Sequence, residues 1–365
     1  MPLMLQPQRI LIWLPNWIGD AVMATPALRG LREHFSQTGA RITHLGRPGP
    51  LETLEGSGLA DEQLVDRSAG GSLGGLWRLA GQIRAGGYDL AVLLPNSFRS
   101  ALVVRLGKVA QRAGYSRDGR GWLLNVRLAP PRDDRGRLAP ISAVDYYIAL
   151  AEHLGARCAS RRLALAVLPH DAQAAAALLD QAHLTNRRPL VMLNPGASFG
   201  VSKLWKPARF AALADALIER RGAGLILNAA PAERAVARQV AAAMRRKSVL
   251  NLANHDNSIG LAKALAARCD LVVTNDTGAR HVAAAVGAAV VTLFGSTDPR
   301  WSAIDYELER AIRVDVPCSP CQKRLCFQPP GPRYHRCMEA ITVQMVLAAA
   351  EELLDLQAAG KAGRP

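Results

Sequence analysis

The sequence contains no long apolar run and few aromatic residues. Aromatic residues make up only 5% of the 365 residues, although hydrophobic residues make up 49%. Alanine-rich helices must therefore supply much of the core surface. No run of about 18 or more uncharged apolar residues occurs, which argues against a transmembrane helix. Residues 1–9 lack the basic and apolar stretches of a signal peptide, so we expect a cytoplasmic protein.

Glycine-rich nucleotide-binding motifs are also missing. The glycines within residues 70–75 have the wrong spacing for the dinucleotide fingerprint G-x-G-x-x-G, and they precede a predicted helix without following a strand. The P-loop pattern G-x-x-x-x-G-K-[ST] does not occur either. A dinucleotide-dependent oxidoreductase and a P-loop kinase therefore lose most of their support.

Acidic residues are few relative to basic ones. The chain has 45 Lys and Arg residues against 30 Asp and Glu residues, which gives a formal net charge of +15. Such a surface favours anionic partners, namely nucleic acid, an anionic membrane face or phosphorylated substrates. The sequence has no arginine-rich arm, no C₂H₂ zinc-finger spacing and no basic patch with interleaved aromatic residues, so we predict no nucleic-acid partner.

The chain does contain strand-like apolar runs that alternate with helical periodicity. Examples are residues 9–15 and 88–95 in the first half, and residues 189–194 and 224–228 in the second half. A chain of this length is too long for a typical single core, so two domains are expected.

The alternation resets around residues 156–170, where a basic stretch precedes Pro169. We place the domain boundary there and predict one domain over residues 1–160 and another over residues 161–365. Each is expected to be an α/β, doubly wound domain, and the two are expected to face each other across a cleft. The last predicted helix, residues 342–356, could pack back on the first domain.

The most informative stretch is residues 271–287, which predicts a buried strand, a polar turn and a helix of small residues. Asp276 or Thr277 is a suitable N-cap for that helix. Gly278 permits close approach of another group, and the first backbone N–H groups of the helix can bind an anion. Thr277 and His281 are four residues apart and share one helix face. The stretch suits a phosphate, or equally a capped helix on which His281 is merely packed.

Other polar residues also follow predicted strands. In the first half these are Asp20, and then Asn96 with Ser97; in the second half Ser198 closes a turn, and Lys203 follows it. Ligands of open α/β sheets bind at the carboxyl ends of strands. Lys203 could add positive charge to a bound diphosphate or could be a solvated loop lysine. Asp20 could equally be an N-cap.

These residues suit group transfer from a nucleotide-activated donor. The leaving diphosphate requires preorganised positive potential, and the attacking hydroxyl requires a base. An aspartate with its normal pKa of about 4 is a weak base, but burial can raise that pKa while nearby cations oppose the rise. We place the donor on the second half and predict that Asp20, on the first half, is the base.

Four of the six cysteines form a cluster in the sequence, with the spacing C-x₂-C-x₄-C-x₁₀-C. This cysteine cluster comprises Cys318, Cys321, Cys326 and Cys337. In a protein expected to be cytosolic, such a group favours metal binding over disulfides, and a structural Zn²⁺ is chemically reasonable. The spacing is irregular, so reduced thiols that hold a loop and redox-sensitive disulfides are alternatives. Cys158 and Cys269 are isolated and are expected to be buried.

Four stretches taken together resemble glycosyltransferase family 9. They are residues 14–23, 94–101, 194–205 and 274–281. The forms Trp-Ile-Gly-Asp and Pro-Asn-Ser-Phe are more similar to the lipopolysaccharide heptosyltransferase II branch of this family than to the heptosyltransferase I branch. The resemblance spans nearly the whole chain in the right order, and the combination of motifs is specific although each motif alone is weak.

The resemblance implies a GT-B fold of two Rossmann-like domains and an inverting transfer that requires no metal or other cofactor. The implied donor is ADP-L-glycero-β-D-manno-heptose, and Asp20 is the implied catalytic base. Within the donor site, Asp276 is expected to cap the helix or bind a hydroxyl, because a carboxylate beside the diphosphate would repel it. Glu233 is expected to contact the nucleoside. The residues implied to hold the donor are Ser198, Lys203, Glu233, Asp276, Thr277, Gly278 and His281.

The implied acceptor is the first heptose of the inner core, carried on Kdo-modified lipid A. The candidates on the acceptor side are Gly19, Asn96, Ser97, Arg99 and Arg120. Basic residues of the first half would meet this anionic glycolipid, so the protein would be cytoplasmic and peripherally associated with the inner face of the inner membrane. The alternatives are a family member that uses another acceptor or nucleotide sugar, such as a heptosyltransferase I-like enzyme, and a non-enzymatic anion- or nucleic-acid-binding protein.

Overall fold

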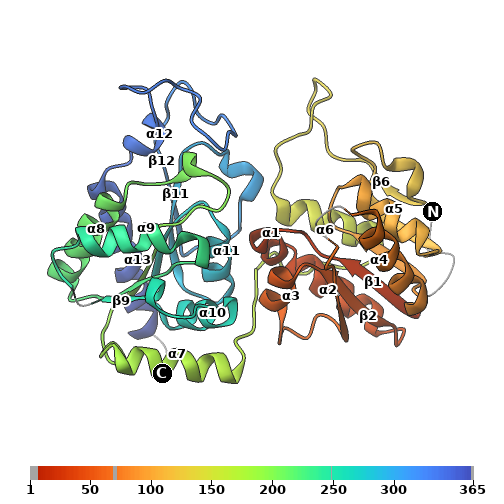
Figure 1. Ribbon diagram of the computed structural model, residues 1–365, viewed down its shortest axis with the longest axis horizontal. Helices are drawn as coiled ribbons and strands as arrows, with labels where there is room; N and C mark the ends of the chain where they lie inside the picture. The colour runs from red at the N-terminus through yellow and green to blue at the C-terminus, as the bar shows by residue number, and fades with distance from the viewer. Residues whose placement is uncertain (1–6, 69–71, 248, 363–365) are drawn as a thin grey trace. The chain divides into compact units, whose positions relative to one another are not determined.

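The computed structural model describes residues 7–68, 72–247 and 249–362, with side chains up to residue 359. Residues 1–6 of the N-terminal segment and residues 70 and 71 of the glycine-rich segment lie outside these ranges. The chain divides into two compact units (Figure 1). Unit 1 runs to Leu165 and also contains Arg300–Asp305, and unit 2 contains the rest of the chain.

The observed division lies close to the predicted boundary after residue 160. The prediction missed the return of Arg300–Asp305 to unit 1, where the Ser142 hydroxyl donates to the Ala303 carbonyl at 2.6 Å. A short segment that crosses to the other unit has no local apolar pattern by which it could be recognised. Within the described ranges, no helix is long and apolar enough to cross a membrane.

Unit 1 is a parallel sheet with helices. Its strands are β1 (Arg9–Trp13), β2 (Arg41–Gly46), β3 (Glu62–Val65), β4 (Leu90–Leu93), β5 (Gln111–Tyr115) and β6 (Val126–Leu128). Its helices are α1 (Ile18–Met23), α2 (Thr25–Ser36), α3 (Pro48–Leu54), α4 (Leu73–Gly86), α5 (Phe98–Leu106), the 3₁₀ turn η1 (Gly121–Leu123) and α6 (Ala143–His153). The strand order is β3-β2-β1-β4-β5-β6. The central strands β1 and β4 are almost continuously apolar because both of their faces are buried.

Unit 2 repeats this design. Its strands are β7 (Leu190–Asn194), β8 (Gly224–Leu227), β9 (Val249–Asn251), β10 (Leu271–Asn275), β11 (Ala289–Phe294) and β12 (Glu309–Arg313). Its α-helices are α7 (Pro169–Gln181), α8 (Pro207–Arg221), α9 (Arg234–Ala243), α10 (Ile259–Arg268), α11 (Gly278–Ala285), α12 (Arg336–Glu339) and α13 (Val343–Ala362). Its 3₁₀ turns are η2 (Val201–Lys203), η3 (Pro231–Glu233) and η4 (Leu252–Asn254), and a further turn, η5 (Pro299–Ser302), lies where the chain passes between units.

The strand order of unit 2 is β12-β11-β10-β7-β8-β9, and each pair of neighbouring strands is parallel. In both sheets the order therefore reverses between the first and the fourth strand of the unit, β1 with β4 and β7 with β10. This is the doubly wound arrangement, in which ligands bind beyond the carboxyl ends of the strands at the point of reversal. The predicted α/β class and the doubly wound architecture of both halves are confirmed.

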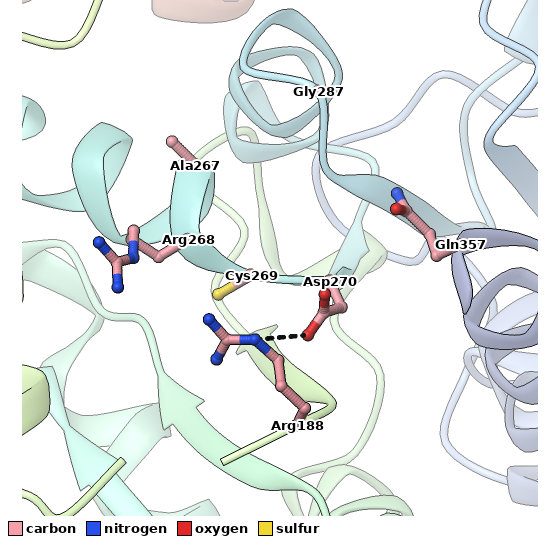
Figure 2. Close-up of a pocket in the computed structure, with 7 residues that line it drawn as sticks. All are labelled: Arg188, Ala267, Arg268, Cys269, Asp270, Gly287 and Gln357. Atoms are coloured by element: carbon pink, nitrogen blue, oxygen red, sulfur yellow. Dashed lines mark ion pairs between the residues drawn. The ribbon is translucent and has the colours of Figure 1, made fainter. Parts of the chain in front are cut away.

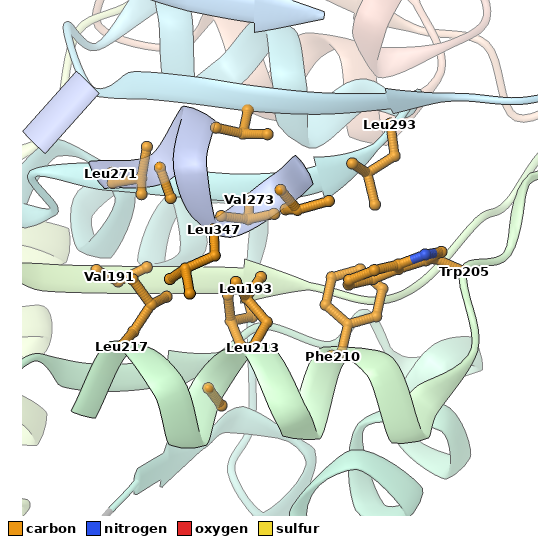
Figure 3. Close-up of a cluster of buried hydrophobic side chains, with 14 of the residues drawn as sticks. Val191, Leu193, Trp205, Phe210, Leu213, Leu217, Leu271, Val273, Leu293 and Leu347 are labelled. Carbon is orange, nitrogen blue, oxygen red and sulfur yellow. The ribbon is translucent and has the colours of Figure 1, made fainter. Parts of the chain in front are cut away.

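The core of unit 2 is formed by β7, β10, β11, α8 and α13 (Figure 3). Trp205 is fully buried, packs edge-on against Phe210 with ring centroids 5.0 Å apart, and donates from its indole N–H to the Ile341 carbonyl at 2.9 Å. Burial of such a side chain contributes about 2–3 kcal/mol, provided that its polar group finds a partner. Because Trp205 lies between β7 and α8, its burial in this core fixes the segment that follows β7.

The last helix, α13, belongs to this core and not to the first domain, so the suggestion that it packs back on that domain is wrong. Leu347, Ala350 and Leu353 on its inner side are buried in the cluster with β11 and α8. The amphipathic pattern of a helix predicts that one side is buried but does not say against which partner.

Candidate functional site

The carboxyl ends of β7 and β10 carry polar side chains that are buried and bonded to one another. Asn194 ends β7, and its amide donates to the Thr274 hydroxyl at 3.2 Å and to the Thr277 hydroxyl at 3.4 Å. Asn228, after β8, donates to the Asn194 side-chain oxygen at 2.8 Å, and Asn257 donates to Asn228 at 3.0 Å. A connected amide network of this kind fixes side-chain positions, because each amide is held by hydrogen bonds to its neighbours.

Asn228 and Asn257 were not predicted as site residues. Asn228 ends the predicted strand over residues 224–228, so the same strand-end rule that selected Asn96 would have found it. Asn257 lies in a loop, and nothing in the local sequence distinguishes it from a solvated asparagine.

Lys203 and Asp276 form a buried ion pair beside this network. The Lys203 ammonium lies 2.5 Å from Asp276 Oδ2 and 2.9 Å from the Asp276 carbonyl oxygen, and both side chains are buried. The Thr297 hydroxyl donates to the same carboxylate oxygen at 2.7 Å. Burial alone would raise the pKa of Asp276, but the Lys203 charge and these hydrogen bonds hold that pKa below its usual range. Lys203 is therefore not a solvated loop lysine.

The helix α11 starts directly after this pair. Its N-cap is Thr277, in an extended conformation and without a side-chain cap hydrogen bond, because the Thr277 hydroxyl contacts Asn194 and Thr274 instead. Of the two residues predicted as N-cap, Thr277 is the one observed, and the Asp276 carboxylate is instead occupied by Lys203 and the Thr297 hydroxyl. The first turn of α11 thus presents backbone N–H groups next to a lysine, which is a suitable arrangement for an anion.

His281 is buried on the inner side of α11. Burial lowers its pKa to about 3, with the nearby Arg280 adding to the shift, so the imidazole is neutral at physiological pH. Its Nδ1 atom has no hydrogen-bond partner among the described residues. Arg280 is also buried and pairs with Glu309, with its Nε 2.5 Å from Oε1. His281 can therefore offer a hydrogen bond to a ligand but not a positive charge.

Glu233 lies against the turn that follows β7. A Cβ atom added to Gly196 would lie 2.0 Å from the Glu233 Cδ atom and 2.1 Å from its Oε2 atom, so only glycine leaves room for this carboxyl group. Burial raises the pKa of Glu233. Ser198, in the same turn, is exposed. The structure thus groups all seven predicted donor residues around the carboxyl ends of β7, β8 and β10.

The loop that carries the cysteine cluster contacts Ser202, the residue next to Lys203. Ser202 is buried; its hydroxyl donates to the Lys323 carbonyl at 2.6 Å and lies 3.0 Å from the Ser296 hydroxyl. The Ser296 carbonyl in turn accepts from the backbone N–H of Cys321 at 3.1 Å. The loop therefore fixes the position of the residue next to Lys203.

All six cysteines are free thiols. Burial raises the pKa of the Cys337 thiol, and the other three thiols of the cysteine cluster add to this rise. Within the described ranges, however, no three His, Cys, Asp or Glu side chains are arranged so that they could hold a metal ion. A zinc site is a hypothesis that metal analysis of the purified protein would test. Cys269 is buried as expected, whereas Cys158 is only half-buried.

In unit 1, Asp20 lies in the first turn of α1, just beyond β1. The N-cap of α1 is Trp17, so Asp20 is not the cap. Its carboxyl group is close enough to the buried Tyr147 to raise the pKa of that phenol, after the larger effect of burial. Asp20 and the neighbouring Gly19 are half-buried at the carboxyl end of a central strand.

The acceptor-side candidates after β4 are held by other residues of unit 1. Ser97 is the N-cap of α5 and accepts from the Ser100 backbone N–H at 3.2 Å. Arg99 pairs with Asp66, with its Nη1 2.9 Å from Oδ2. The Asn96 side-chain oxygen accepts from the Tyr146 hydroxyl at 3.1 Å.

The prediction that Arg120 contacts the acceptor is wrong. Its side chain is fully buried, and it donates to the Tyr115 carbonyl at 3.1 Å, to the Pro95 carbonyl, and to the Asn96 side chain at 3.2 Å. Burial lowers its pKa to about 10. Arg120 therefore ties the loop after β4 to β5 and is not positioned to contact an acceptor.

A hollow of about 260 Å³ lies elsewhere in unit 2 (Figure 2). Arg188 and Asp270, which line it, precede β7 and β10, so it is at the amino ends of these strands. Asp270 accepts the backbone N–H of Leu190 at 2.8 Å and lies 3.8 Å from the Arg188 side chain. The hollow is thus at the opposite edge of the sheet from the polar network and shares none of its residues.

Comparison with known proteins agrees with this geometry. The chain is 29% identical over 355 residues to lipopolysaccharide heptosyltransferase 2 of Salmonella typhimurium, a match that covers 95% of this chain and 98% of the relative. It is 30% identical to lipooligosaccharide heptosyltransferase 2 of Haemophilus ducreyi, covering 80% of this chain and 85% of the relative.

The solved structure of Escherichia coli ADP-heptose lipopolysaccharide heptosyltransferase II is also similar. The two superpose with a TM-score of 0.75 at 27% identity, over 96% of this chain and 99% of that one. The family described as glycosyltransferase family 9 (heptosyltransferase) matches residues 76–330. The match covers most of both units, and the chain belongs to glycosyltransferase family 9.

Proposed function

We propose that this glycosyltransferase moves a heptose from ADP-L-glycero-β-D-manno-heptose to the heptosyl-Kdo₂-lipid A inner core of lipopolysaccharide. The observation that carries the proposal is the buried Lys203–Asp276 pair beside the N-terminus of α11, at the point where the strand order of unit 2 reverses. The relatives that match nearly the whole chain are heptosyltransferases of the second type, which supports this acceptor over that of a heptosyltransferase I-like enzyme.

We assign the ADP diphosphate to the first turn of α11. An ammonium group has three N–H donors, and Asp276 accepts two hydrogen bonds from Lys203, so a third donor can reach a phosphate oxygen. Because Lys203 is already neutralised by Asp276, most of the potential would come from the helix N-terminus and from hydrogen bonds of Thr277 and neutral His281. Glu233 would accept hydrogen bonds from the nucleoside hydroxyls.

We assign the role of general base to Asp20. The acceptor hydroxyl oxygen forms a bond to C1 of the heptose, the bond from C1 to the diphosphate oxygen breaks, and the hydroxyl proton passes to the Asp20 carboxylate. Attack opposite to the leaving group inverts the anomeric configuration. The developing charge on ADP is stabilised by the donor groups of unit 2, and the proposed reaction has no metal step.

The proposed acceptor is an anionic glycolipid, which requires the protein to work at a membrane surface. The net charge of +15 supports this assignment, since basic side chains attract anionic lipid headgroups. We therefore place the protein in the cytoplasm, peripherally associated with the inner face of the inner membrane.

The test is transfer from ADP-heptose to truncated lipopolysaccharides of defined structure, comparing Asp20→Asn with the parent protein. We expect transfer to the acceptor that ends in one heptose, a loss in kcat of about 10²–10⁴-fold for Asp20→Asn, and unchanged ADP binding by calorimetry. Transfer only to an acceptor without heptose would instead indicate a heptosyltransferase I-like activity. Near-normal turnover of Asp20→Asn would remove this residue from the role of base.

A further inference from the structure

The exposed apolar residues of unit 1 gather on three neighbouring elements. The inner sides of α4, α5 and η1 contribute Leu79, Val103 and Leu123 to one buried cluster with β1 and β4. The three elements therefore cover the same face of the sheet, with α4 beside α5 and α5 beside η1 (Figure 1). Their outer sides form one continuous surface, which we call the α4–α5 face.

Large apolar side chains are exposed on the α4–α5 face. Leu73 is 76% exposed and Trp77 is 59% exposed, and these residues are one helical turn apart on α4. Phe98, at the start of α5, is 43% exposed, and Trp122 of η1 is 71% exposed. The rings of Phe98 and Trp122 lie 6.2 Å apart, so these two side chains form one pair, and Leu73 and Trp77 form a second pair on the neighbouring helix.

The segment that carries these side chains is mostly basic. Residues 72–132, which include all three elements, contain ten Lys and Arg residues and only two acidic residues, Asp89 and Asp118. Arg78, Arg105 and Lys108 are exposed and form no ion pair with any described residue. Neither α4 nor α5 contains an acidic residue. The α4–α5 face therefore carries exposed apolar and aromatic side chains together with exposed basic ones.

We propose that the α4–α5 face docks this protein on a bilayer that contains anionic lipids. Trp and Phe side chains insert at the level of the headgroups, where an apolar ring and a polar surrounding are both accommodated. The basic side chains neutralise anionic headgroups, and each strengthens binding by about fivefold. The inference rests on the proposed function, because an acceptor embedded in a membrane requires the enzyme to reach that membrane.

Gly81 provides a test that leaves the fold intact. It is exposed on α4, one helical turn beyond Trp77 on the same side, and a Cβ atom added there would meet no atom within 4 Å. Replacing a glycine inside a helix by another residue also favours the helix. Gly81→Glu and Gly81→Lys therefore change the backbone alike and the charge oppositely.

The experiment measures binding of the full chain, without substrates, to two kinds of vesicle. One kind contains phosphatidylethanolamine and the anionic phosphatidylglycerol, and the other contains only phosphatidylcholine. We expect binding to the anionic vesicles only, weakened about fivefold by Gly81→Glu and strengthened about fivefold by Gly81→Lys. Trp77→Ala and Trp122→Ala should each weaken binding. Phe327→Ala, which removes a ring of unit 2 that is also 59% exposed, is the matched control and should have no effect.

Equal vesicle binding by the two Gly81 variants, or an equal loss for Phe327→Ala, would overturn the proposal. So would sedimentation velocity in which the parent protein self-associates and Trp77→Ala is monomeric, because a second copy would then cover this face. Transfer to a water-soluble, delipidated acceptor is measured in parallel. This activity should be unchanged in all of these variants, and its absence in the parent protein would count against the proposed function and not against the docking face.

Discussion

Replacing His281 by glutamine should remove a pH dependence from the stability of unit 2. The folded state holds this imidazole neutral, because burial lowers its pKa to about 3. The unfolded state has a normal histidine, whose pKa is 6.5. Between these two values the unfolded state binds one proton more than the folded state, so the free energy of unfolding falls as the pH falls below 6.5.

The expected size follows from the distance between the two pKa values. Each pH unit within this window changes the free energy of unfolding by about 1.4 kcal/mol. A shift from pH 7.5 to pH 5.0 crosses about 1.5 units of the window, so His281 should account for a loss of about 2 kcal/mol. The slope should end near pH 3, where the folded state also takes up the proton.

The assay is urea unfolding at pH 7.5 and pH 5.0. Unfolding is monitored by hydrogen exchange of peptides from β10 and α11, which report on unit 2 alone. His281→Gln should lower stability at both pH values but should lose about 2 kcal/mol less than the parent between them. The matched control is His44→Gln, because His44 of unit 1 is also buried, with a pKa lowered to about 4. This control should alter the pH dependence of unit 1 peptides only. An unchanged pH dependence of unit 2 in His281→Gln would refute the reasoning.

Two further predictions concern the buried groups around the donor site. Lys203→Met should destabilise unit 2 by about 3–5 kcal/mol in urea unfolding, because it leaves the Asp276 carboxylate buried without its cation. The double variant Lys203→Met/Asp276→Leu should recover part of this loss. If the losses of the two single variants simply add in the double variant, the pairing is contradicted. Gly196→Ala should displace Glu233 and weaken ADP binding about tenfold, since the new methyl group would overlap the carboxyl group. Calorimetry should then find Gly196→Ala/Glu233→Ala no weaker than either single variant, and additive losses would show that the two residues act separately.

The sequence was sufficient for the architecture because strand and helix periodicity are local. Buried parallel strands such as β1 and β10 are continuous apolar runs, and the polar residue at the end of each run marks the edge where ligands bind. The edge strands β6, β9 and β12 were not predicted, because all three are only partly buried and because β6 and β9 have only three residues each.

Residue roles were harder to predict because they depend on partners that are distant in the sequence. Arg120 was predicted to face the acceptor, yet carbonyl groups from Tyr115 and Pro95 surround it. Asp276 was predicted to cap a helix or to bind a hydroxyl, yet Lys203 occupies its carboxylate across a separation of 73 residues. A charged residue is normally exposed, and only the folded chain shows whether enough partners compensate its burial.

By itself the sequence determined two doubly wound halves, the family resemblance and the set of strand ends that carry chemistry. Only the tertiary structure decided which of these residues meet. It placed Glu233 against Gly196, connected Asn194 to Asn228 and Asn257, and packed α13 on unit 2. The physical reason is that secondary structure follows from neighbouring residues, whereas the pairing of buried polar groups follows from strand order, which no local pattern encodes.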